Sequence, residues 1–154
     1  MNKPEDRIKF HFLVDRFYFP KRNFLKAFLA KQLKKEGKKI DAINYIFCSD
    51  KYLLQMNQQY LNHDTLTDII TFELSSNGQP LLSDIYISID RVRENVSVFE
   101  TTFQCELHRV IIHGALHLSG YKDKSEEQAR QMREKEDEWL NRYFVSRETL
   151  TKQD

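Results

Sequence analysis

Two histidines and an aspartate are regularly spaced in residues 113–123, His-Gly-Ala-Leu-His-Leu-Ser-Gly-Tyr-Lys-Asp. On a helix, His113 and His117 project from the same face, one turn apart. Gly120 stands where such a helix can end, because glycine accepts a left-handed backbone, and the chain can then bring Asp123 back toward the histidines. Two imidazoles and one carboxylate suit Zn²⁺ and leave a coordination position open for water or substrate. The spacing therefore predicts a catalytic metal site with the ligands His113, His117 and Asp123.

The alternative is that both histidines are hydrogen-bonded core residues. The apolar segment 110–112 directly precedes His113 and indicates a buried helix. Because a buried imidazole without a partner is costly, both rings need partners in either case. The core interpretation leaves the position of Asp123 unexplained, so we favour the metal site.

The length and composition of the chain indicate one globular domain. Its 154 residues are 40% hydrophobic and 12% aromatic, which is enough to form a core without disulfides. We expect the domain to span residues 1–144 and residues 145–154 to form a flexible tail. No apolar run is long enough to cross a bilayer, and the N-terminus lacks the apolar core of a secretory signal. Cys48 and Cys105 have no Cys-x-x-Cys spacing and are expected to be buried thiols of a reducing compartment, which favours a cytoplasmic protein.

The net charge of +1 conceals an asymmetry along the chain. Residues 1–40 hold 12 Lys/Arg and 4 Asp/Glu, whereas the remaining residues hold 12 and 19. The basic excess is concentrated in residues 20–35, where Leu25, Leu29 and Leu33 recur at helical spacing. Two interpretations stay open: a solvated surface helix, or a surface that binds the phosphates of a polyanion. The same pattern can lie on a membrane, but no other feature supports that, so no membrane partner is expected.

Hydrophobic periodicity and turn residues predict an α+β fold. Alternating apolar residues indicate strands near 8–14, 43–47, 68–74 and 84–89, the last two joined by a turn at Asn77-Gly78. Helical spacing and capping residues indicate helices over 20–37, 49–60, 90–99, 104–119, and from 125 to between 139 and 144. We expect a small mixed sheet of about four strands, with parallel neighbours and one antiparallel hairpin, packed by about five helices.

The residue after the first histidine bears on the reaction. Zincin peptidases place a glutamate there as general base, whereas this chain has Gly114. The spacing His-x-x-x-His-x-x-Gly-x-x-Asp is metzincin-like, but Met132 is a poor match for the methionine turn of that class, so peptide hydrolysis is disfavoured. Asp68 and Asp84, near the starts of two predicted strands, are candidates for entering the cleft and deprotonating a water molecule. Each can also be an ordinary strand-edge or capping residue.

Three parts of the chain resemble the YbeY family. They are residues 106–123, residues 56–60 followed by 67–72 (Met-Asn-Gln-Gln-Tyr and Thr-Asp-Ile-Ile-Thr-Phe), and residues 83–88 (Ser-Asp-Ile-Tyr-Ile-Ser). The resemblance implies a bacterial metal-dependent endoribonuclease of single-stranded RNA. It further implies a role in small-subunit ribosomal RNA maturation and ribosome quality control, with the small ribosomal subunit or its proteins as partners. One Zn²⁺ per chain is the implied cofactor, and another divalent transition metal could take its place.

Three residues depart from the family pattern. Asp123 stands where the family usually has a third histidine ligand, and its carboxylate still suits Zn²⁺. Lys122 replaces the acidic residue before that ligand. Leu61 replaces an arginine that is thought to contact the RNA backbone, and leucine cannot make a charged contact with phosphate. Lys122, Lys124 and Arg91 are candidates for supplying that charge.

Three functions are consistent with these residues. The favoured one is an endoribonuclease in which the two histidines, Asp68 and Asp84 are catalytic, and Tyr60 and Tyr121 stack unpaired bases. The second is a non-enzymatic ribosome-assembly or RNA-binding factor with a structural metal, for which Leu61 is the main argument. The third is a metzincin-like metallopeptidase. The sequence does not indicate an oligomeric state.

Overall fold

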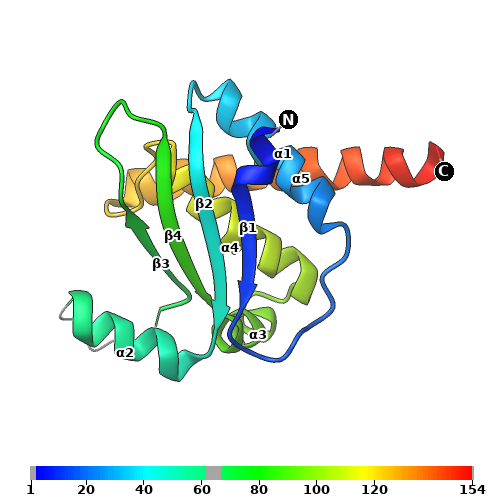
Figure 1. The fold of residues 1–154 in the computed structure, drawn as a ribbon. Helices are drawn as coiled ribbons and strands as arrows, with labels where there is room; N and C mark the ends of the chain where they lie inside the picture. The colour runs from blue at the N-terminus through cyan, green and yellow to red at the C-terminus, as the bar shows by residue number, and fades with distance from the viewer. Residues whose placement is uncertain (1–2, 62–66, 154) are drawn as a thin grey trace.

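A computed structural model describes residues 3–61 and 67–153 of the chain. A four-stranded sheet lies at the centre, and helices cover it (Figure 1). The strands are β1 (Ile8–Phe12), β2 (Ile40–Cys48), β3 (Ile69–Glu73) and β4 (Leu81–Ser88). The helical elements are the 3₁₀ turn η1 (Pro4–Arg7), α1 (Arg22–Lys35), α2 (Asp50–Leu61), α3 (Ile89–Val98), α4 (Phe103–Leu118) and α5 (Glu126–Gln153). The predicted α+β fold class is confirmed.

The strand order β1-β2-β4-β3 combines parallel and antiparallel neighbours. Strand β2 pairs in parallel with both β1 and β4, whereas β3 and β4 form an antiparallel hairpin. Gly78, in the turn of that hairpin, has a φ of 82°, a left-handed conformation that glycine adopts without strain. The mixed sheet with one hairpin is the one expected from the alternating sequence pattern.

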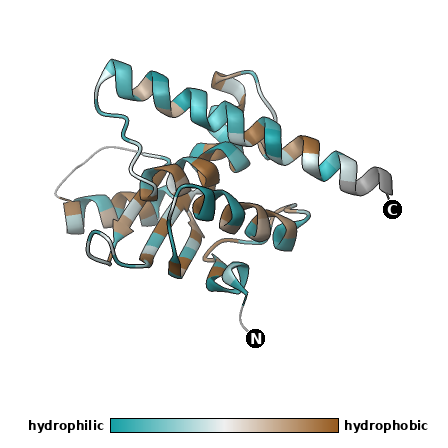
Figure 2. Cartoon of the chain, turned by 90° about the horizontal axis from the view of Figure 1, so that it is seen from above, coloured by the Kyte–Doolittle hydropathy of each residue, from teal (hydrophilic) through white to brown (hydrophobic). Residues whose placement is uncertain are grey.

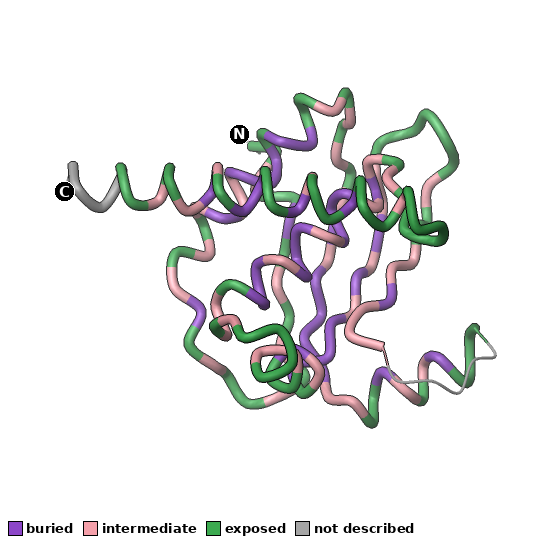
Figure 3. Tube along the Cα trace, turned by 180° about the vertical axis from the view of Figure 1, so that it is seen from behind, coloured by how far each residue is buried: buried purple, intermediate pink, exposed green. Residues whose placement is uncertain are grey.

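The two faces of the sheet have different partners. Ile85 and Ile87 of β4 are 0% exposed and belong to the main core, to which α1, α3, α4 and α5 also contribute. Helix α2 contributes Leu53 to a smaller cluster with Cys48 and Ile70 on the other side. Seen from behind, α5 crosses over α4, which lies between α5 and the sheet (Figure 3). Hydrophobic residues are concentrated in the strands and in α4, whereas much of α5 is hydrophilic (Figure 2).

Helix α4 approaches the sheet closely at Gly114. A Cβ atom added to Gly114 would lie 3.2 Å from side-chain atoms of Ile69 and Ile85. A larger side chain would therefore push α4 away from β3 and β4. Gly114 faces the sheet, so the glutamate that zincins have at this position would collide with Ile69 and Ile85.

His108 is buried on the same helix. Its Nδ1 donates a hydrogen bond to the carbonyl oxygen of Gln104 at 2.6 Å, and its ring stacks on Tyr143 with centroids 5.1 Å apart. Burial lowers the pKa of His108 to about 4, although the hydrogen bond to Gln104 opposes this shift. The folded core therefore favours the neutral ring.

Capping side chains fix several helix starts. Ser49 accepts a hydrogen bond at 3.1 Å from a backbone N–H in the first turn of α2, and Ser125 forms a capping box with Gln128 at the start of α5. Helix α3 begins at Ile89, one residue before the helix predicted over 90–99, and Ser88 caps it by accepting a hydrogen bond from the N–H of Arg91 at 3.2 Å.

Two further expectations differ from the structure. Helix α5 continues to Gln153, beyond its predicted end between residues 139 and 144, because residues 145–153 contain neither glycine nor proline. The flexibility of residues 145–154 stays a prediction. Cys48 is buried as expected, but Cys105 is exposed near the start of α4. Within the described residues, no helix is both long and apolar enough to cross a membrane.

Replacing Gly114 by valine should destabilise the fold through overpacking against Ile69 and Ile85, by about 1–3 kcal/mol. Urea denaturation measures this loss in the free energy of unfolding. The matched control is Cys105→Val on the exposed side of α4, which should cost less than about 1 kcal/mol. Equal losses in the two variants would contradict the close approach.

Replacing His108 by leucine should remove a pH dependence of stability. The unfolded imidazole ionises near pH 6.5, whereas the folded one ionises near pH 4. The unfolded state therefore binds more protons in this interval, and the parent protein loses stability as the pH falls through it, by up to about 3 kcal/mol. Urea denaturation at both ends of the interval should show the parent losing stability relative to the variant; a constant difference would exclude this effect.

Candidate active site

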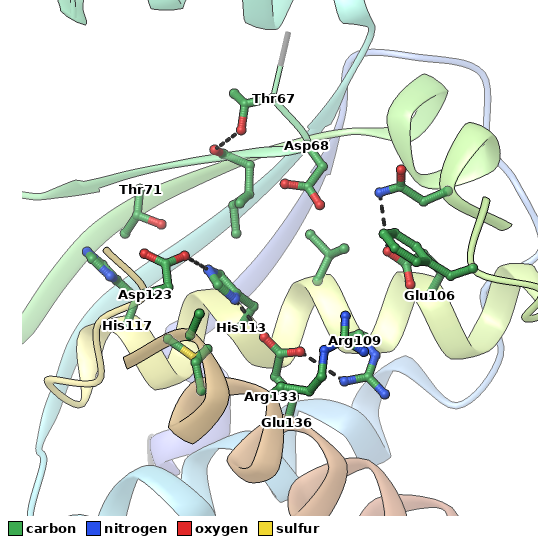
Figure 4. Close-up of a pocket in the computed structure, with 16 residues that line it drawn as sticks. Thr67, Asp68, Thr71, Glu106, Arg109, His113, His117, Asp123, Arg133 and Glu136 are labelled. Atoms are coloured by element: carbon green, nitrogen blue, oxygen red, sulfur yellow. Dashed lines mark hydrogen bonds and ion pairs between the residues drawn. The ribbon is translucent and has the colours of Figure 1, made fainter. Parts of the chain in front are cut away.

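A pocket of about 550 Å³ opens between β3, α4 and α5 (Figure 4). Its walls include four of the five residues predicted from the sequence, namely Asp68, His113, His117 and Asp123. Helix α5 adds side chains on the facing wall, among them Met132, Arg133 and Glu136. The three predicted metal ligands and Asp68, a predicted catalytic residue, therefore line the same cavity.

The end of α4 positions these residues as expected. Gly120 has a φ of 105°, a left-handed conformation that reverses the chain directly after the helix. The N–H of Tyr121 donates to the carbonyl oxygen of Leu116 at 3.1 Å and closes this turn. The loop then carries Asp123 back to His113, with Asp123 Oδ2 at 3.3 Å from His113 Nε2.

Both ring nitrogens of His113 face carboxylates. Nδ1 donates a hydrogen bond to Oε2 of Glu136 at 2.7 Å, while Nε2 lies 3.3 Å from Oδ2 of Asp123. Because Nδ1 carries the proton that it donates to Glu136, Nε2 is the position left for a second proton or a metal ion. A nitrogen lone pair and a carboxylate oxygen repel each other at this distance, so a cation between Nε2 and Asp123 would stabilise the site.

Burial and neighbouring charges shift two pKa values in the pocket. Burial disfavours protonation of His113, but the hydrogen bond and charge of Glu136, with the charges of Asp123 and Asp68, outweigh it and raise the pKa. Burial raises the pKa of Asp68, and the positive charge that His113 can carry opposes this rise. The carboxyl group of Asp68 therefore holds a proton more readily than an exposed aspartate.

Glu136 also binds an arginine. It is 7% exposed and accepts from Nη1 of Arg109 at 2.9 Å, and Nη2 of Arg109 donates to Asp137 at 2.6 Å. Arg133 lines the same pocket, with its guanidinium 6.0 Å from the ring centroid of Phe99. In the described part of the chain Arg133 forms no ion pair, so it is the arginine of the pocket whose charge is not committed to a carboxylate.

The donor types in the pocket suit a divalent metal ion. His113 Nε2 and Asp123 already face each other, and His117 lines the same cavity. Over the described residues, no three His, Cys, Asp or Glu side chains converge as a complete ligand set. A three-ligand site therefore requires His113, His117 and Asp123 to come closer together when a metal ion binds.

Asp84 lies outside this pocket. It follows the alternation of β4 and faces the side of the sheet opposite the core residues Ile85 and Ile87. There Asn44 donates a hydrogen bond to Asp84 Oδ1 at 3.2 Å, and Asp84 lines a separate hollow. The expectation that Asp84 enters the cleft with the histidines is not met.

The tyrosines expected to stack bases are also placed elsewhere. Tyr60 is 62% exposed and lines the hollow on the opposite face of the sheet. Tyr121 donates a hydrogen bond from its hydroxyl group to Glu36 at 3.3 Å, away from the lining of the pocket. Neither ring is in position to hold a base in the pocket.

Leu61 replaces the arginine of the family pattern, and none of Arg91, Lys122 and Lys124 supplies the missing positive charge in the pocket. Leu61 ends α2 and is 42% exposed, outside the pocket lining. Arg91 is bound to Asp50 at 3.0 Å. Lys122 and Lys124 are exposed and do not line the pocket. Arg133 is better placed than any of these three.

Sequence reasoning missed the contribution of α5. Ala129, Met132, Arg133 and Glu136 follow the i, i+3, i+4, i+7 spacing of one helix face, and all four line the pocket. This spacing was available in the sequence as a signal. It marks a face that packs on another element, but it does not say that the element is the histidine helix.

Replacing Glu136 by glutamine should lower the pKa of His113, because a charged hydrogen bond and its electrostatic attraction are lost. An NMR titration of the imidazole nitrogens in metal-free protein measures this pKa. Asp137→Asn is the matched control, because Asp137 binds Arg109 and leaves the contact of His113 intact. An unchanged His113 titration in the Glu136 variant would contradict the arrangement.

Comparison with known proteins agrees with this geometry. The family model described as Endoribonuclease YbeY matches residues 18–144. The Endoribonuclease YbeY of Flavobacterium psychrophilum is 54% identical over 123 residues, 80% of this chain and 84% of the relative. That of Cytophaga hutchinsonii is 46% identical over 137 residues, 89% and 96% of the two chains. The solution structure of TM1509 from Thermotoga maritima has a TM-score of 0.63 and 28% identity, covering 96% of this chain and 95% of that one. The chain therefore belongs to the endoribonuclease YbeY family.

Proposed function

We propose that this protein is a metal-dependent endoribonuclease that cleaves single-stranded RNA. The observation that carries the proposal is the pair of His113 Nε2 and Asp123 Oδ2, 3.3 Å apart in a pocket that His117 also lines. Two relatives that are 54% and 46% identical to this chain over 123 and 137 aligned residues bear the name Endoribonuclease YbeY, which supports the same activity. Its substrate in the cell would be small-subunit ribosomal RNA, during maturation and quality control of ribosomes in the cytoplasm.

His113, His117 and Asp123 would hold one divalent metal ion, with Zn²⁺ as the first candidate. When bound, such an ion supplies Lewis-acid polarisation of a phosphoryl oxygen. Glu136 keeps the proton of His113 on Nδ1 and so leaves Nε2 free to bind the ion. Protonation of His113 would compete with metal binding, so occupancy should rise with pH.

Asp68 is the proposed general base. It stands on the wall of the pocket formed by β3, and burial raises its pKa toward the range in which a carboxylate accepts a proton effectively. Arg133 on the facing wall would neutralise the phosphate, in place of the family arginine that is Leu61 here. Arg109 instead orients Glu136 and Asp137.

One observation bears on the alternative of a non-enzymatic assembly factor, which the relatives named Endoribonuclease YbeY do not favour. Leu61 gives this chain an exposed apolar residue where an RNA-contacting arginine is expected, which is consistent with an RNA-binding assembly factor that has lost its chemistry. Peptide hydrolysis has no such support. Gly114 lies against Ile69 and Ile85, so no side chain at that position could act as the peptidase general base.

The test is cleavage of a labelled single-stranded RNA by zinc-loaded protein, beside His117→Ala prepared identically. We expect cleavage by the parent and a loss of at least about 100-fold in the variant, because metal and positioning supply most of the barrier reduction. Isothermal titration with Zn²⁺ should show weaker binding by the variant. Arg133→Gln should reduce cleavage without weakening Zn²⁺ binding.

The outcome separates the two functions. Equal cleavage by the parent and His117→Ala would indicate a contaminating nuclease and contradict the proposal. RNA binding without cleavage, unchanged in His117→Ala, would favour the assembly factor. A surface variant that keeps the pocket intact, Lys51→Gln on α2, controls for non-specific effects of substitution.

A further inference from the structure

A second hollow is lined by residues of β1, of α1 and of the segment that joins them. Figure 1 shows this segment at the β1 edge of the sheet, opposite the edge formed by β3. Its volume is about 710 Å³. Three cations and three phenylalanines line it, namely Lys21, Arg22, Lys26, Phe10, Phe19 and Phe24. A smaller adjoining hollow of about 180 Å³ adds a fourth cation, Arg16, and the exposed ring of Tyr18. We call the two together the α1 hollow.

Within the described residues, the cations of the α1 hollow are free of close ion pairs. In the described part of the chain, none of Arg16, Lys21, Arg22 and Lys26 forms an ion pair. The cations of α5 differ, since Arg130 binds two glutamates of its own helix. The α1 hollow therefore concentrates positive charge that no ion pair neutralises, although the charge of Asp6 acts on Lys26.

Repulsion among these cations is visible at Lys26. Burial lowers the pKa of Lys26, and the positive charges of Arg22 and Lys9 lower it further, whereas Asp6 opposes them. A bound anion would relieve this repulsion.

Aromatic rings hold the cations at the surface of the α1 hollow. Lys26 Nζ lies 5.0 Å from the ring centroid of Phe10. The guanidinium groups of Arg16 and Arg22 lie 5.6 and 5.8 Å from that of Phe12. Such contacts orient the cations without cancelling their charge. Unpaired cations beside aromatic rings are the combination that proteins use to bind single-stranded nucleic acids.

The structure disfavours a membrane as the partner. The apolar residues of α1, Leu25, Leu29 and Leu33, are at most 1% exposed and belong to the main core. These three leucines are therefore not available to insert into lipid, and most of the exposed side chains of α1 are lysines.

We propose that the α1 hollow binds the phosphodiester backbone of single-stranded RNA at a distance from the site of cleavage. This inference rests on the proposed function for the identity of the polyanion. The α1 hollow lies at the β1 edge of the sheet, whereas the pocket lies by β3 at the other edge. An RNA that contacts both must be longer than the few nucleotides that fill the pocket, so the α1 hollow matters for long substrates and not for short ones.

The test compares two triple variants of the same helix. The first neutralises the α1 hollow with Lys21→Gln, Arg22→Gln and Lys26→Gln. The matched control neutralises three exposed lysines of α1 outside the hollow, with Lys31→Gln, Lys34→Gln and Lys35→Gln. Both variants change the net charge equally, so long-range attraction is reduced equally in both and only the local contact differs.

Fluorescence anisotropy of a labelled 20-nucleotide single-stranded RNA at several salt concentrations gives the affinity. We expect the α1-hollow variant to bind at least about tenfold more weakly at low salt, with a salt slope smaller by about 2, as for three lost phosphate contacts. The control should change by less than about threefold. Binding of a trinucleotide should be the same in all three proteins.

Equal weakening in both variants would assign the effect to diffuse charge, and no weakening in either would leave the α1 hollow without a role; both results overturn the proposal. An equal loss for heparin, a polyanion without bases, would overturn the assignment to RNA. Circular dichroism checks folding, and Arg16→Gln with Lys21→Gln, two exposed residues, replaces the triple variant if that fails to fold.

The binding assay does not depend on cleavage. Loss of binding in the α1-hollow variant, with no cleavage by any protein, would support the α1 hollow and contradict the nuclease. Cleavage that depends on His117, with unchanged RNA binding in the α1-hollow variant, would support the nuclease and contradict the α1 hollow as an RNA-binding site.

Discussion

The close contact of α4 with the sheet at Gly114 is the constraint on which the site depends. A Cβ atom there would already lie 3.2 Å from Ile69 and Ile85, so the helix axis is held against β3 and β4. His113 precedes the glycine and is directed to the side of the helix, into the gap beside β3 that α5 closes. Because a densely packed core leaves a helix little freedom to move, this contact fixes the distance of both histidines from Asp68, which directly precedes β3. The positions of the two histidines therefore depend on the packing of Gly114, although Gly114 itself has no reactive side chain.

Glu136 is the second element that the site requires. It is buried from α5 and is shared by His113 and Arg109, so its charge is balanced although it is removed from water. The exposed pairs of α5, such as Arg130 with Glu127, are screened by water and contribute little to stability. The pair of His113 and Glu136 instead selects one tautomer of a ring that faces Asp123. Helix α5 thus serves to orient the ring as well as to cover the core.

The sequence indicates the local features of this site and not its long-range partners. The spacing of His113, His117 and Asp123 and the turn glycine were sufficient to predict the shared cavity, because a helix and its end are determined by nearby residues. Glu136 could not be assigned, because its spacing on α5 shows a packed face without naming the element beneath it. Asp84 was misplaced although the information was present, since it alternates with Ile85 and Ile87 and so must face away from the core. The misjudged end of α5 has a different cause, because no glycine or proline stops that helix.

The basic first 40 residues and the acidic pocket have complementary roles in the proposed function. The proposed metal ion and the orientation of His113 both require carboxylates, and the pocket contains Asp68, Glu106, Asp123 and Glu136. These groups repel a polyanionic substrate, and two arginines in the pocket compensate them only in part, since Arg109 is already bound to Glu136. Attraction for RNA must then come from a surface outside the pocket. The α1 hollow, within the first 40 residues that hold 12 Lys/Arg against 4 Asp/Glu, supplies that surface at the opposite edge of the sheet, away from the proposed metal ligands.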